Sequence, residues 1–192
     1  MLATVMLVFF APLMLGVAIA VFVQDGGPVF FAHRRLGLNG SSFACLKFRS
    51  MATDAQARFN HLLAVDPGAR TEWERDHKLR NDPRITRLGE FLRRSSLDEL
   101  PQLFNVLRGE MSLVGPRPIV EAEAHRYGRR ICNYCSVRPG ITGLWQVSGR
   151  NDTSYRRRVA IDVVYSRRKS LTLDARILLM TIPAVLLRRG SY

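Results

Sequence analysis

An adjacent acidic pair, Asp98-Glu99, stands where the sequence predicts the start of a helix, directly after Arg93 and Arg94. Positive charge beside a helix N-terminus adds to the field of the free backbone N–H groups, and this combination favours binding of an anion such as a pyrophosphate. Neighbouring residues on a helix point about 100° apart, so the two carboxylates can hold separate roles. Arg117 follows in a Gly-Pro-Arg-Pro segment and is suited to a bidentate phosphate contact.

The segment around the acidic pair also defines the elements that must position it. Ser96 followed three residues later by Glu99 matches a capping box, which predicts a helix start there. Pro101 is tolerated so early in a helix, and Gly109 is suited to end it. The prolines of residues 115–118 disfavour helix, so Arg117 should lie on a stiff loop. A capping box followed by a loop would also explain these residues without any chemistry, and the residues alone leave both interpretations open.

Length, charge and cysteine content restrict the class of protein. A chain of 192 residues with 47% hydrophobic residues suffices for one folded domain plus an attachment. A net charge of +13 indicates anionic partners, whether nucleic acid, a phospholipid surface or phosphorylated small molecules. The odd number of cysteines argues against a disulfide framework. Cys132 and Cys135 form a C-x-x-C pair without a second pair for zinc, so ordinary thiols are the default.

Residues 1–24 carry no charged side chain and are long enough to cross a hydrocarbon core. Pro12, in the middle, predicts a kink or reversal of the helix. Three interpretations compete: a signal peptide, a spanning helix, and a helix-break-helix that enters one leaflet and returns. A signal peptide lacks a basic region ahead of the apolar run, whereas a spanning helix would place the basic remainder in the cytoplasm.

Residues 29–49 are predicted to form a β-hairpin around Asn39-Gly40, with His33, Arg34 and Arg35 pointing outward. Strand alternation places Lys47 and Arg49 on one face and Phe48 on the other. The glycine-rich block at 137–150 has a composition for tight turns in which backbone can approach a ligand closely. Helices are predicted for most of the remainder, at 53–63, 69–79, 88–92, 121–130, 155–169 and 171–187, and the first two should be hinged at Asp66-Pro67-Gly68. The last of these helices fits either a membrane surface or a protein core.

Residues 95–118 resemble the signature of the bacterial sugar transferases, also called polyprenyl-phosphate hexose-1-phosphate transferases or monotopic phosphoglycosyl transferases. Other blocks of that family follow its order, namely residues 47–51 (KFRSM), 82–86 (DPRIT) and 138–150 (RPGITGLWQVSGR). The resemblance covers nearly the whole chain from about residue 29. A departure is that members usually carry a short basic stretch with an aspartate directly before the apolar helix, and none precedes it in this sequence.

The resemblance implies an α+β fold: a small, mostly helical catalytic domain with a short β-hairpin (residues 25–192), preceded by a re-entrant membrane helix (residues 1–24) broken at Pro12. It implies transfer of hexose 1-phosphate from a UDP-sugar to undecaprenyl phosphate with release of UMP. Asp98 would be the nucleophile that forms an aspartyl phospho-sugar, and Glu99 would bind Mg²⁺. The remaining candidates would contact phosphate or nucleotide, or serve the structure: Lys47, Arg93, Arg117, Arg150 and Asp162.

The same resemblance implies a monotopic protein of the bacterial inner membrane whose catalytic domain faces the cytoplasm. Residues 144–152 resemble the galactose-phosphate branch of the family, with glucose 1-phosphate as the alternative substrate. We expect UDP-hexose and undecaprenyl phosphate as partners and no nucleic acid, and a homodimer stays open. Two rival classes explain part of the sequence: a basic nucleic-acid-binding protein, and a membrane-associated protein without enzymatic activity.

Overall fold

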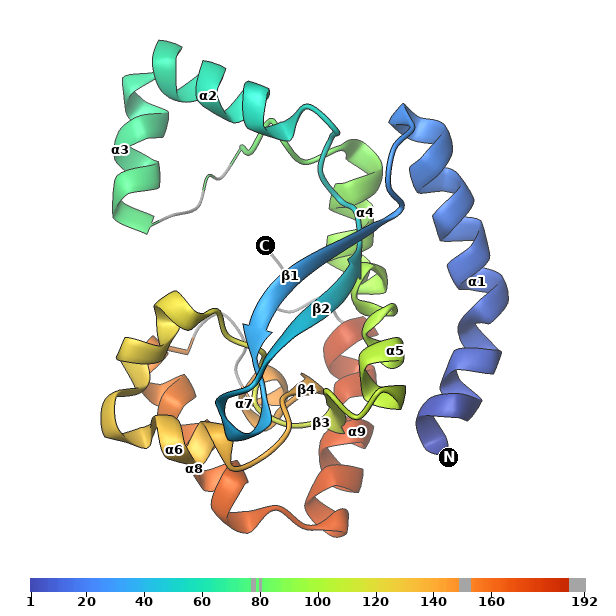
Figure 1. Cartoon of the computed structure of the whole chain (residues 1–192), viewed down its shortest axis with the longest axis vertical. Coiled ribbons are helices and arrows are strands. Elements are labelled where there is room, and N and C mark those ends of the chain that lie inside the picture. The colour runs from blue at the N-terminus through green and yellow to red at the C-terminus, as the bar shows by residue number, and fades with distance from the viewer. Residues whose placement is uncertain (77–78, 80, 149–152, 187–192) are drawn as a thin grey trace.

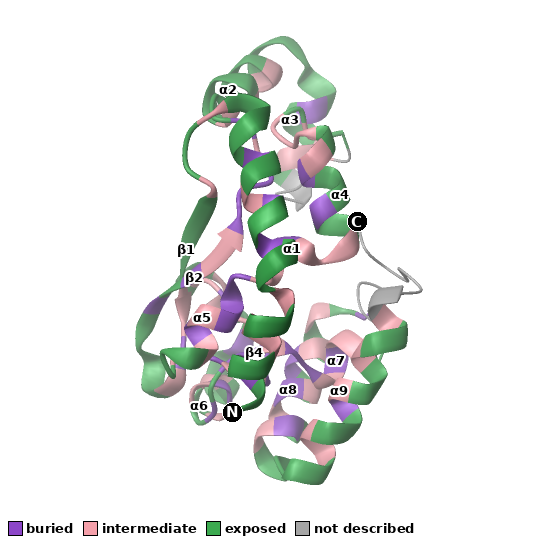
Figure 2. Ribbon diagram, turned by 90° about the vertical axis from the view of Figure 1, so that its right-hand side faces the viewer, coloured by how far each residue is buried: buried purple, intermediate pink, exposed green. Residues whose placement is uncertain are grey.

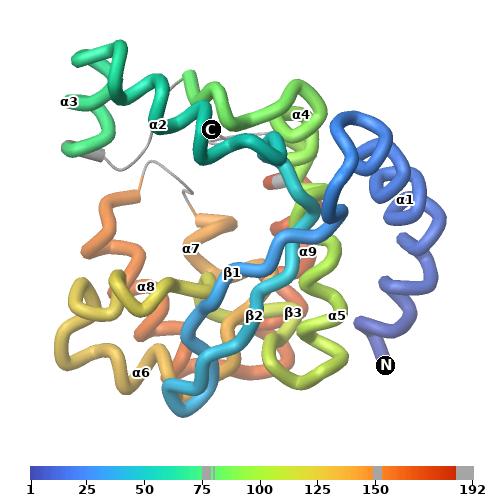
Figure 3. Tube along the Cα trace, turned by 45° about the horizontal axis from the view of Figure 1, so that its top comes forward, coloured from blue at the N-terminus to red at the C-terminus, as the bar shows by residue number. Residues whose placement is uncertain are grey.

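A β-hairpin runs through the middle of the molecule in the computed structural model, which describes residues 1–76, 79, 81–148 and 153–186. β1 (Phe30–Leu36) pairs antiparallel with β2 (Ser42–Phe48), and η1 (Leu38–Gly40) joins them. Asn39 and Gly40 take the positive φ angles, 55° and 74°, that this turn requires. The predicted hairpin is confirmed. Helices α1, α4 and α5 lie on one side of it, and α6, α7 and α8 on the other (Figures 1 and 3).

The first apolar core lies between the hairpin and three helices: α1 (Leu2–Asp25), α4 (Arg87–Ser95) and α5 (Gln102–Leu107). Thr86 begins α4, because its side chain accepts a hydrogen bond from the Gly89 backbone N–H at 2.9 Å. The short 3₁₀ turn η2 (Leu97–Glu99) connects α4 to α5. The buried members of this core are Met14, Val17, Val21, Phe48 and Leu92. Packing of α1 against this core fixes the apolar N-terminal helix to the elements that carry the acidic pair.

α1 is one helix from Leu2 to Asp25, and Pro12 lies inside it. Proline removes a single hydrogen bond, and the bonds on either side, together with packing against α5, suffice to continue the helix. Within the described residues, α1 is the helix long and apolar enough to cross a membrane. Large apolar side chains along it are exposed (Figure 2). The re-entrant arrangement stays a prediction.

The C-terminal end of α1 is joined to the chain that follows β2. The Arg49 guanidinium pairs with Asp25 and donates hydrogen bonds to the carbonyls of Val21 and Gly26, at 3.2 and 2.5 Å. Asp25 in turn accepts a hydrogen bond from the Thr53 backbone N–H at 3.0 Å. Arg49 thus contacts the end of α1, whereas Lys47, two residues earlier, contacts the acidic pair.

The second part of the fold surrounds a short parallel pair, β3 (Ser112–Val114) and β4 (Gly140–Thr142), which the sequence did not predict. Its helices are η3 (Glu121–Arg130), α6 (Ile131–Cys135), α7 (Leu144–Val147), α8 (Tyr155–Arg168) and α9 (Leu171–Leu186). η3 is a 3₁₀ segment broken at Gly128 rather than the predicted α-helix. Ile177 of α9 is fully buried with Val114 and Tyr165, so one side of α9 belongs to this core.

Two helices stand apart from both cores, α2 (Ala55–Val65) and α3 (Pro67–Asp76) (Figure 1). They meet at Pro67, which begins α3, and this confirms the predicted pair and its hinge. The Arg84 guanidinium lies 4.4 Å from the ring centre of Phe59 and 5.2 Å from that of Trp73. These contacts tie the helical pair back to the chain that enters α4.

Candidate active site

The acidic pair lies on η2, between the end of α4 and the start of α5. Ser96 has a left-handed backbone, with φ of 59°, and it ends α4. No side-chain hydrogen bond from Ser96 caps η2, so the predicted capping box is wrong. The reason is that Ser96 has to turn the chain out of α4, which removes it from the geometry that an N-cap needs. Capping therefore does not explain why Asp98 and Glu99 stand here.

Lys47 contacts both carboxylates of the pair. Its Nζ donates a hydrogen bond to Glu99 Oε1 at 2.6 Å and lies 3.6 Å from Asp98 Oδ2. The Asp98 side chain is 9% exposed, that of Glu99 19% and that of Lys47 25%. Two adjacent, largely buried carboxylates repel each other, and the ammonium between them compensates that repulsion.

Asn105 of α5 sets the position of the strand that carries Lys47. Its Oδ1 accepts a hydrogen bond from the Leu46 backbone N–H at 3.0 Å, and its Nδ2 donates to the Ala44 carbonyl at 2.8 Å. Asn105 is fully buried, and its Nδ2 also reaches Glu110 at 2.6 Å. The edge of β2 is thus held to α5 through side-chain bonds that mimic a neighbouring strand. Sequence reasoning missed Asn105, because a polar residue in a short helix carries no signal of burial.

Arg93 approaches the pair from α4. Its Nε donates a hydrogen bond to Ser50 Oγ at 2.8 Å, and its charge acts on Asp98. α4 packs directly on the backbone of Ser50: a Cβ added at Gly89 would lie 1.9 Å from the Ser50 carbonyl oxygen. Glycine is required there, since any side chain would push α4, and Arg93 with it, away from the strand.

Arg117 reaches the pair from the loop after β3, where its Nη2 lies 4.0 Å from Glu99 Oε1. The loop is held by the parallel pair: the Gly115 N–H donates to the Thr142 carbonyl at 2.9 Å, and the Gly140 N–H to the Pro116 carbonyl at 2.8 Å. A Cβ on Gly115 would lie 2.4 Å from the Arg138 carbonyl oxygen. The glycines of the glycine-rich block thus allow two segments of this chain to approach closely, whereas the predicted approach to a ligand stays a prediction.

A small open cavity lies beside the pair, on the side of Glu99. Its lining comes from both parts of the fold: Arg35, Cys45, Lys47, Glu99, Gln102, Arg117, Pro118, Ile141 and Gln146. Arg35 was predicted to point outward, but its side chain is half-buried and faces this cavity. The sequence could not predict that α5 and the loop of Arg117 cover the face of β1 that carries Arg35.

The electrostatic environment shifts the pKa values of the two carboxyl groups in opposite directions. Burial raises the pKa of Asp98, and Glu99 adds to this effect, while Lys47, Arg93 and Arg117 oppose it. Burial also raises the pKa of Glu99, but Lys47, Arg117 and Arg35 outweigh it and hold that pKa below its ordinary value. Glu99 is the more firmly ionised of the two. Asp98 is the more basic, a property that suits a carboxylate acting as a nucleophile.

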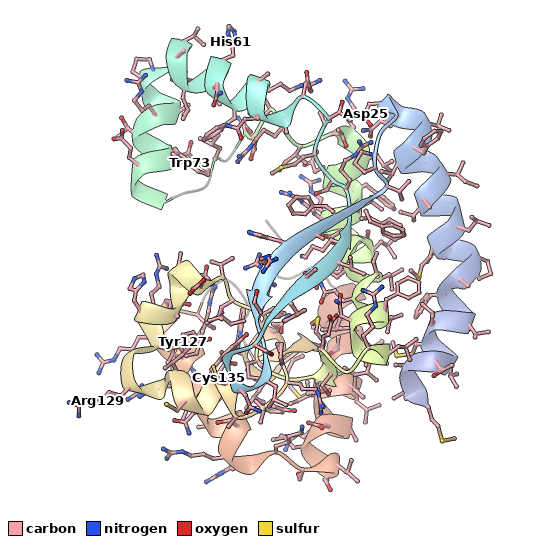
Figure 4. The ribbon with its side chains drawn as sticks, in the orientation of Figure 1. Asp25, His61, Trp73, Tyr127, Arg129 and Cys135 are labelled. Atoms are coloured by element: carbon pink, nitrogen blue, oxygen red, sulfur yellow. The ribbon has the colours of Figure 1, made fainter. Side chains whose placement is uncertain are left out.

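One predicted site residue, Asp162, lies apart from this group. Asp162 of α8 is 2% exposed and accepts a hydrogen bond from the Tyr127 hydroxyl at 2.8 Å, among the residues of η3 and α6. Figure 4 shows Tyr127 in that part of the molecule. Asp162 does not line the cavity beside Glu99. Arg150 lies outside the described residues. Within the described residues, no cluster of three or more potential metal ligands occurs, and Cys132 and Cys135 are free thiols.

Comparisons with known proteins cover the whole of this fold. A family profile described as bacterial sugar transferase matches residues 1–188. The exopolysaccharide production protein ExoY of Rhizobium meliloti is 52% identical over 190 residues, which are 99% of this chain and 84% of that protein.

Two further relatives are named for galactose. The undecaprenyl-phosphate galactose phosphotransferase of Salmonella typhimurium is 53% identical over 186 residues, 97% of this chain and 39% of that protein. The UDP-galactose-lipid carrier transferase of Erwinia amylovora is 55% identical over 169 residues, 88% of this chain and 35% of that protein. The chain thus spans little more than a third of these two relatives.

Proposed function

Because the chain belongs to the bacterial sugar transferase family, we propose that it transfers a hexose 1-phosphate from a UDP-sugar to undecaprenyl phosphate and releases UMP. The observation that carries the proposal is the contact of Lys47 with both Asp98 and Glu99, in a place where Arg93 and Arg117 add positive charge. This constellation can hold phosphate groups and present a desolvated carboxylate to phosphorus.

The reaction proceeds in two displacements, because direct attack of one phosphate anion on another is opposed by their repulsion. In the first, an oxygen of Asp98 bonds to the phosphorus that carries the sugar, and the bond from that phosphorus to the UMP oxygen breaks. UMP leaves with the bonding electron pair. In the second, an oxygen of the lipid phosphate attacks the same phosphorus and the bond to Asp98 breaks. The products are the lipid diphosphate sugar and a regenerated Asp98 carboxylate, with no proton required.

Mg²⁺ is the metal that the family implies, and the residues present fit it. Magnesium is bound in proteins by one or two carboxylates together with substrate phosphates and water, so an adjacent acidic pair without further ligands is a suitable donor set. Glu99 would hold the ion, with substrate phosphate oxygens completing its shell. When bound, Mg²⁺ neutralises charge that develops on the phosphates. Lys47, Arg93 and Arg117 position those phosphates through charge-assisted hydrogen bonds.

The acceptor lipid explains why an apolar helix accompanies this site. The phosphate of undecaprenyl phosphate lies at the membrane face while its tail stays in the hydrocarbon. We propose that α1, as a monotopic re-entrant helix, anchors the protein in the cytoplasmic leaflet of the bacterial inner membrane, where a cytosolic UDP-sugar can meet that phosphate. The exposed apolar side chains of α1 support membrane insertion.

Galactose is the hexose that we propose, because two relatives carry galactose in their names. A third relative is named as a protein of exopolysaccharide production. The reaction would then begin the membrane stage of exopolysaccharide synthesis. Membranes containing the protein should release UMP from UDP-galactose when undecaprenyl phosphate and Mg²⁺ are present, and more slowly or not at all from UDP-glucose.

The Asp98→Asn variant is the decisive control, with Glu99→Gln beside it. Mass spectrometry of wild-type protein mixed with UDP-galactose alone should find one hexose phosphate on the peptide that contains Asp98. Full activity of Asp98→Asn would exclude the covalent mechanism. Absence of UMP release from every UDP-hexose tested would favour a membrane protein without this activity.

A further inference from the structure

Arg35 is a cation of the cavity that the proposed mechanism has not used. It lies on β1, opposite Phe43 of β2, and lines the cavity together with Lys47, Glu99 and Arg117. Its neighbour Arg34 points to the other face of the strand and is exposed. Of these two consecutive arginines, Arg35 is the one that lines the cavity beside Glu99.

Arg35 has no carboxylate partner among the described residues. Its guanidinium makes a hydrogen bond with His33 Nδ1 at 3.2 Å, and no ion pair within 4.0 Å includes it. The charges of Glu99 and Glu123 act on it at longer range than an ion pair, and the charge of Arg117 repels it. A half-buried guanidinium beside two other cations is costly unless an anion compensates it. The cavity that it faces is where such an anion would bind.

The cations around the acidic pair differ in whether they line the cavity. Lys47 lies 2.6 Å from Glu99 Oε1 and 3.6 Å from Asp98 Oδ2, and Arg117 lies 4.0 Å from Glu99 Oε1. Lys47, Arg117 and Arg35 line the cavity together with Glu99, whereas Asp98 and Arg93 do not.

Displacement at phosphorus requires the attacking and leaving oxygens to be roughly in line. With Asp98 as the attacking group, the leaving oxygen must lie on the side of the phosphorus that points away from Asp98. Lys47 and Arg117 would then hold the transferred phosphoryl group. Arg35 is the further cation that lines the same cavity.

We propose that Arg35 binds the phosphate of the departing UMP, which would lie at the open cavity beside Glu99. This inference rests on the proposed function, because it takes Asp98 as the nucleophile and UMP as the leaving group. Arg35 stabilises negative charge that grows on the leaving oxygen as the bond to phosphorus breaks. It is therefore a substrate-binding residue whose loss weakens UMP binding and slows the first displacement.

The test compares UMP with uridine as ligands of the purified full-length protein in detergent, measured by titration calorimetry. The two ligands differ by one phosphate, so the ratio of the dissociation constant of uridine to that of UMP measures the contribution of the phosphate contact. Arg35→Gln should reduce that ratio about tenfold or more, the size expected for loss of a charge-assisted hydrogen bond. Arg35→Lys, which keeps the charge but not the bidentate geometry, should lie between Arg35→Gln and wild type. Arg34→Gln, the matched control on the other face of β1, should equal wild type.

A second readout is single-turnover release of UMP from UDP-galactose in the absence of acceptor lipid. Arg35→Gln should slow this step tenfold or more, whereas kcat/KM for undecaprenyl phosphate should stay unchanged, because that ratio depends only on the second displacement. If Arg35→Gln fails to fold, Arg35→Lys decides through the same ratio of dissociation constants for uridine and UMP. A ratio in the Arg35 variants equal to that of Arg34→Gln would overturn the inference.

The outcome also separates this inference from the proposed function. If wild-type protein releases UMP and the Arg35 variants bind UMP normally, only the leaving-group subsite is wrong. If wild-type protein binds neither UMP nor UDP-galactose and releases no UMP, the proposed function itself is wrong.

Discussion

Lys47 and Glu99 form a hydrogen-bonded ion pair of 2.6 Å that joins the β-hairpin to η2, across 52 positions of the sequence. The same ammonium lies close to Asp98, so this single contact ties the strand to both members of the acidic pair. Its loss would leave adjacent, largely buried carboxylates without their nearest compensating charge.

Lys47→Met keeps the apolar stem of the side chain and removes its charge. We expect UMP release to fall by about a hundredfold or more, because a preorganised charge at reacting phosphate contributes on the order of 3 kcal/mol. The initial rate with UDP-galactose and undecaprenyl phosphate measures this loss. Lys169→Met, at the exposed C-terminal end of α8, is the control and should keep wild-type activity.

Removal of divalent cations with EDTA should abolish UMP release, and Mg²⁺ should restore it. Glu99→Gln should raise the Mg²⁺ concentration that gives half-maximal rate, since a neutral amide is a weaker ligand for a hard cation than a carboxylate. A magnesium titration at fixed UDP-galactose measures the shift. An unchanged half-maximal concentration in Glu99→Gln would remove Glu99 from the proposed metal site.

Asn105→Leu replaces the buried amide that bonds the backbone at Ala44 and Leu46. Leaving those groups unpaired should destabilise the protein by about 2–3 kcal/mol, which lowers the thermal unfolding midpoint by roughly 4–10 °C. Thermal melting in detergent measures the shift. Asn60→Leu, whose amide is exposed on α2, should move the midpoint by no more than 1–2 °C, roughly the effect of an ordinary surface substitution.

Gly89→Ala tests the close packing of α4 against Ser50. The added methyl group meets backbone rather than a flexible side chain, so we expect a loss of about 2–4 kcal/mol in stability and reduced UMP release because Arg93 is displaced. Gly16→Ala makes the same change inside α1, where nothing lies within 4 Å of the new carbon. It should leave both stability and activity intact. Equal behaviour of the two variants would contradict the packing at Ser50.

Asp162 should make stability depend on pH. Burial raises the pKa of its carboxyl from an ordinary 3.8 to about 7, only partly opposed by the hydrogen bond from Tyr127. The folded protein thus keeps a proton up to about pH 7 that the unfolded chain has already lost, so stability falls as pH rises from about 4 to about 7 and then levels.

Asp162→Asn removes this titration while keeping a similar shape. Relative to wild type, the variant should gain roughly 2–4 kcal/mol between pH 5 and pH 8. Unfolding midpoints of both proteins across that range measure the gain. A difference between the two proteins that does not change with pH would show that Asp162 is ionised in the folded state.

Local signals predicted the local structure. The Asn39-Gly40 turn predicted the hairpin, and Pro67 predicted the joint between α2 and α3, because each residue acts through its own backbone angles. The β3–β4 pair was not predictable, since strands of three residues are too short to show alternation. The signal at Ser96 was misleading: a serine three residues before a glutamate fits a capping box, but the preceding helix determined its conformation.

The acidic pair, Lys47, Arg93 and Arg117 were identified from resemblance to a family, and the structure brings them together. Their mutual contacts could not be derived from spacing, because they depend on β2 being held to α5 through Asn105 and on the loop of Arg117 being held by Gly115 against residues 138–142. Arg35 was missed because which face of a hairpin is covered depends on segments distant in sequence.

The bond network of Arg49 with Asp25 and the last carbonyls of α1 has a consequence for transplanting this enzyme fold. A chimera in which a foreign membrane helix replaces α1 would lose hydrogen-bond acceptors of the buried Arg49 guanidinium. Arg49 lies only two positions after Lys47, so this loss would be close to the acidic pair. Exchange of the anchor should therefore succeed only where the incoming helix ends with an acidic residue at the position of Asp25 and a free carbonyl at the position of Val21.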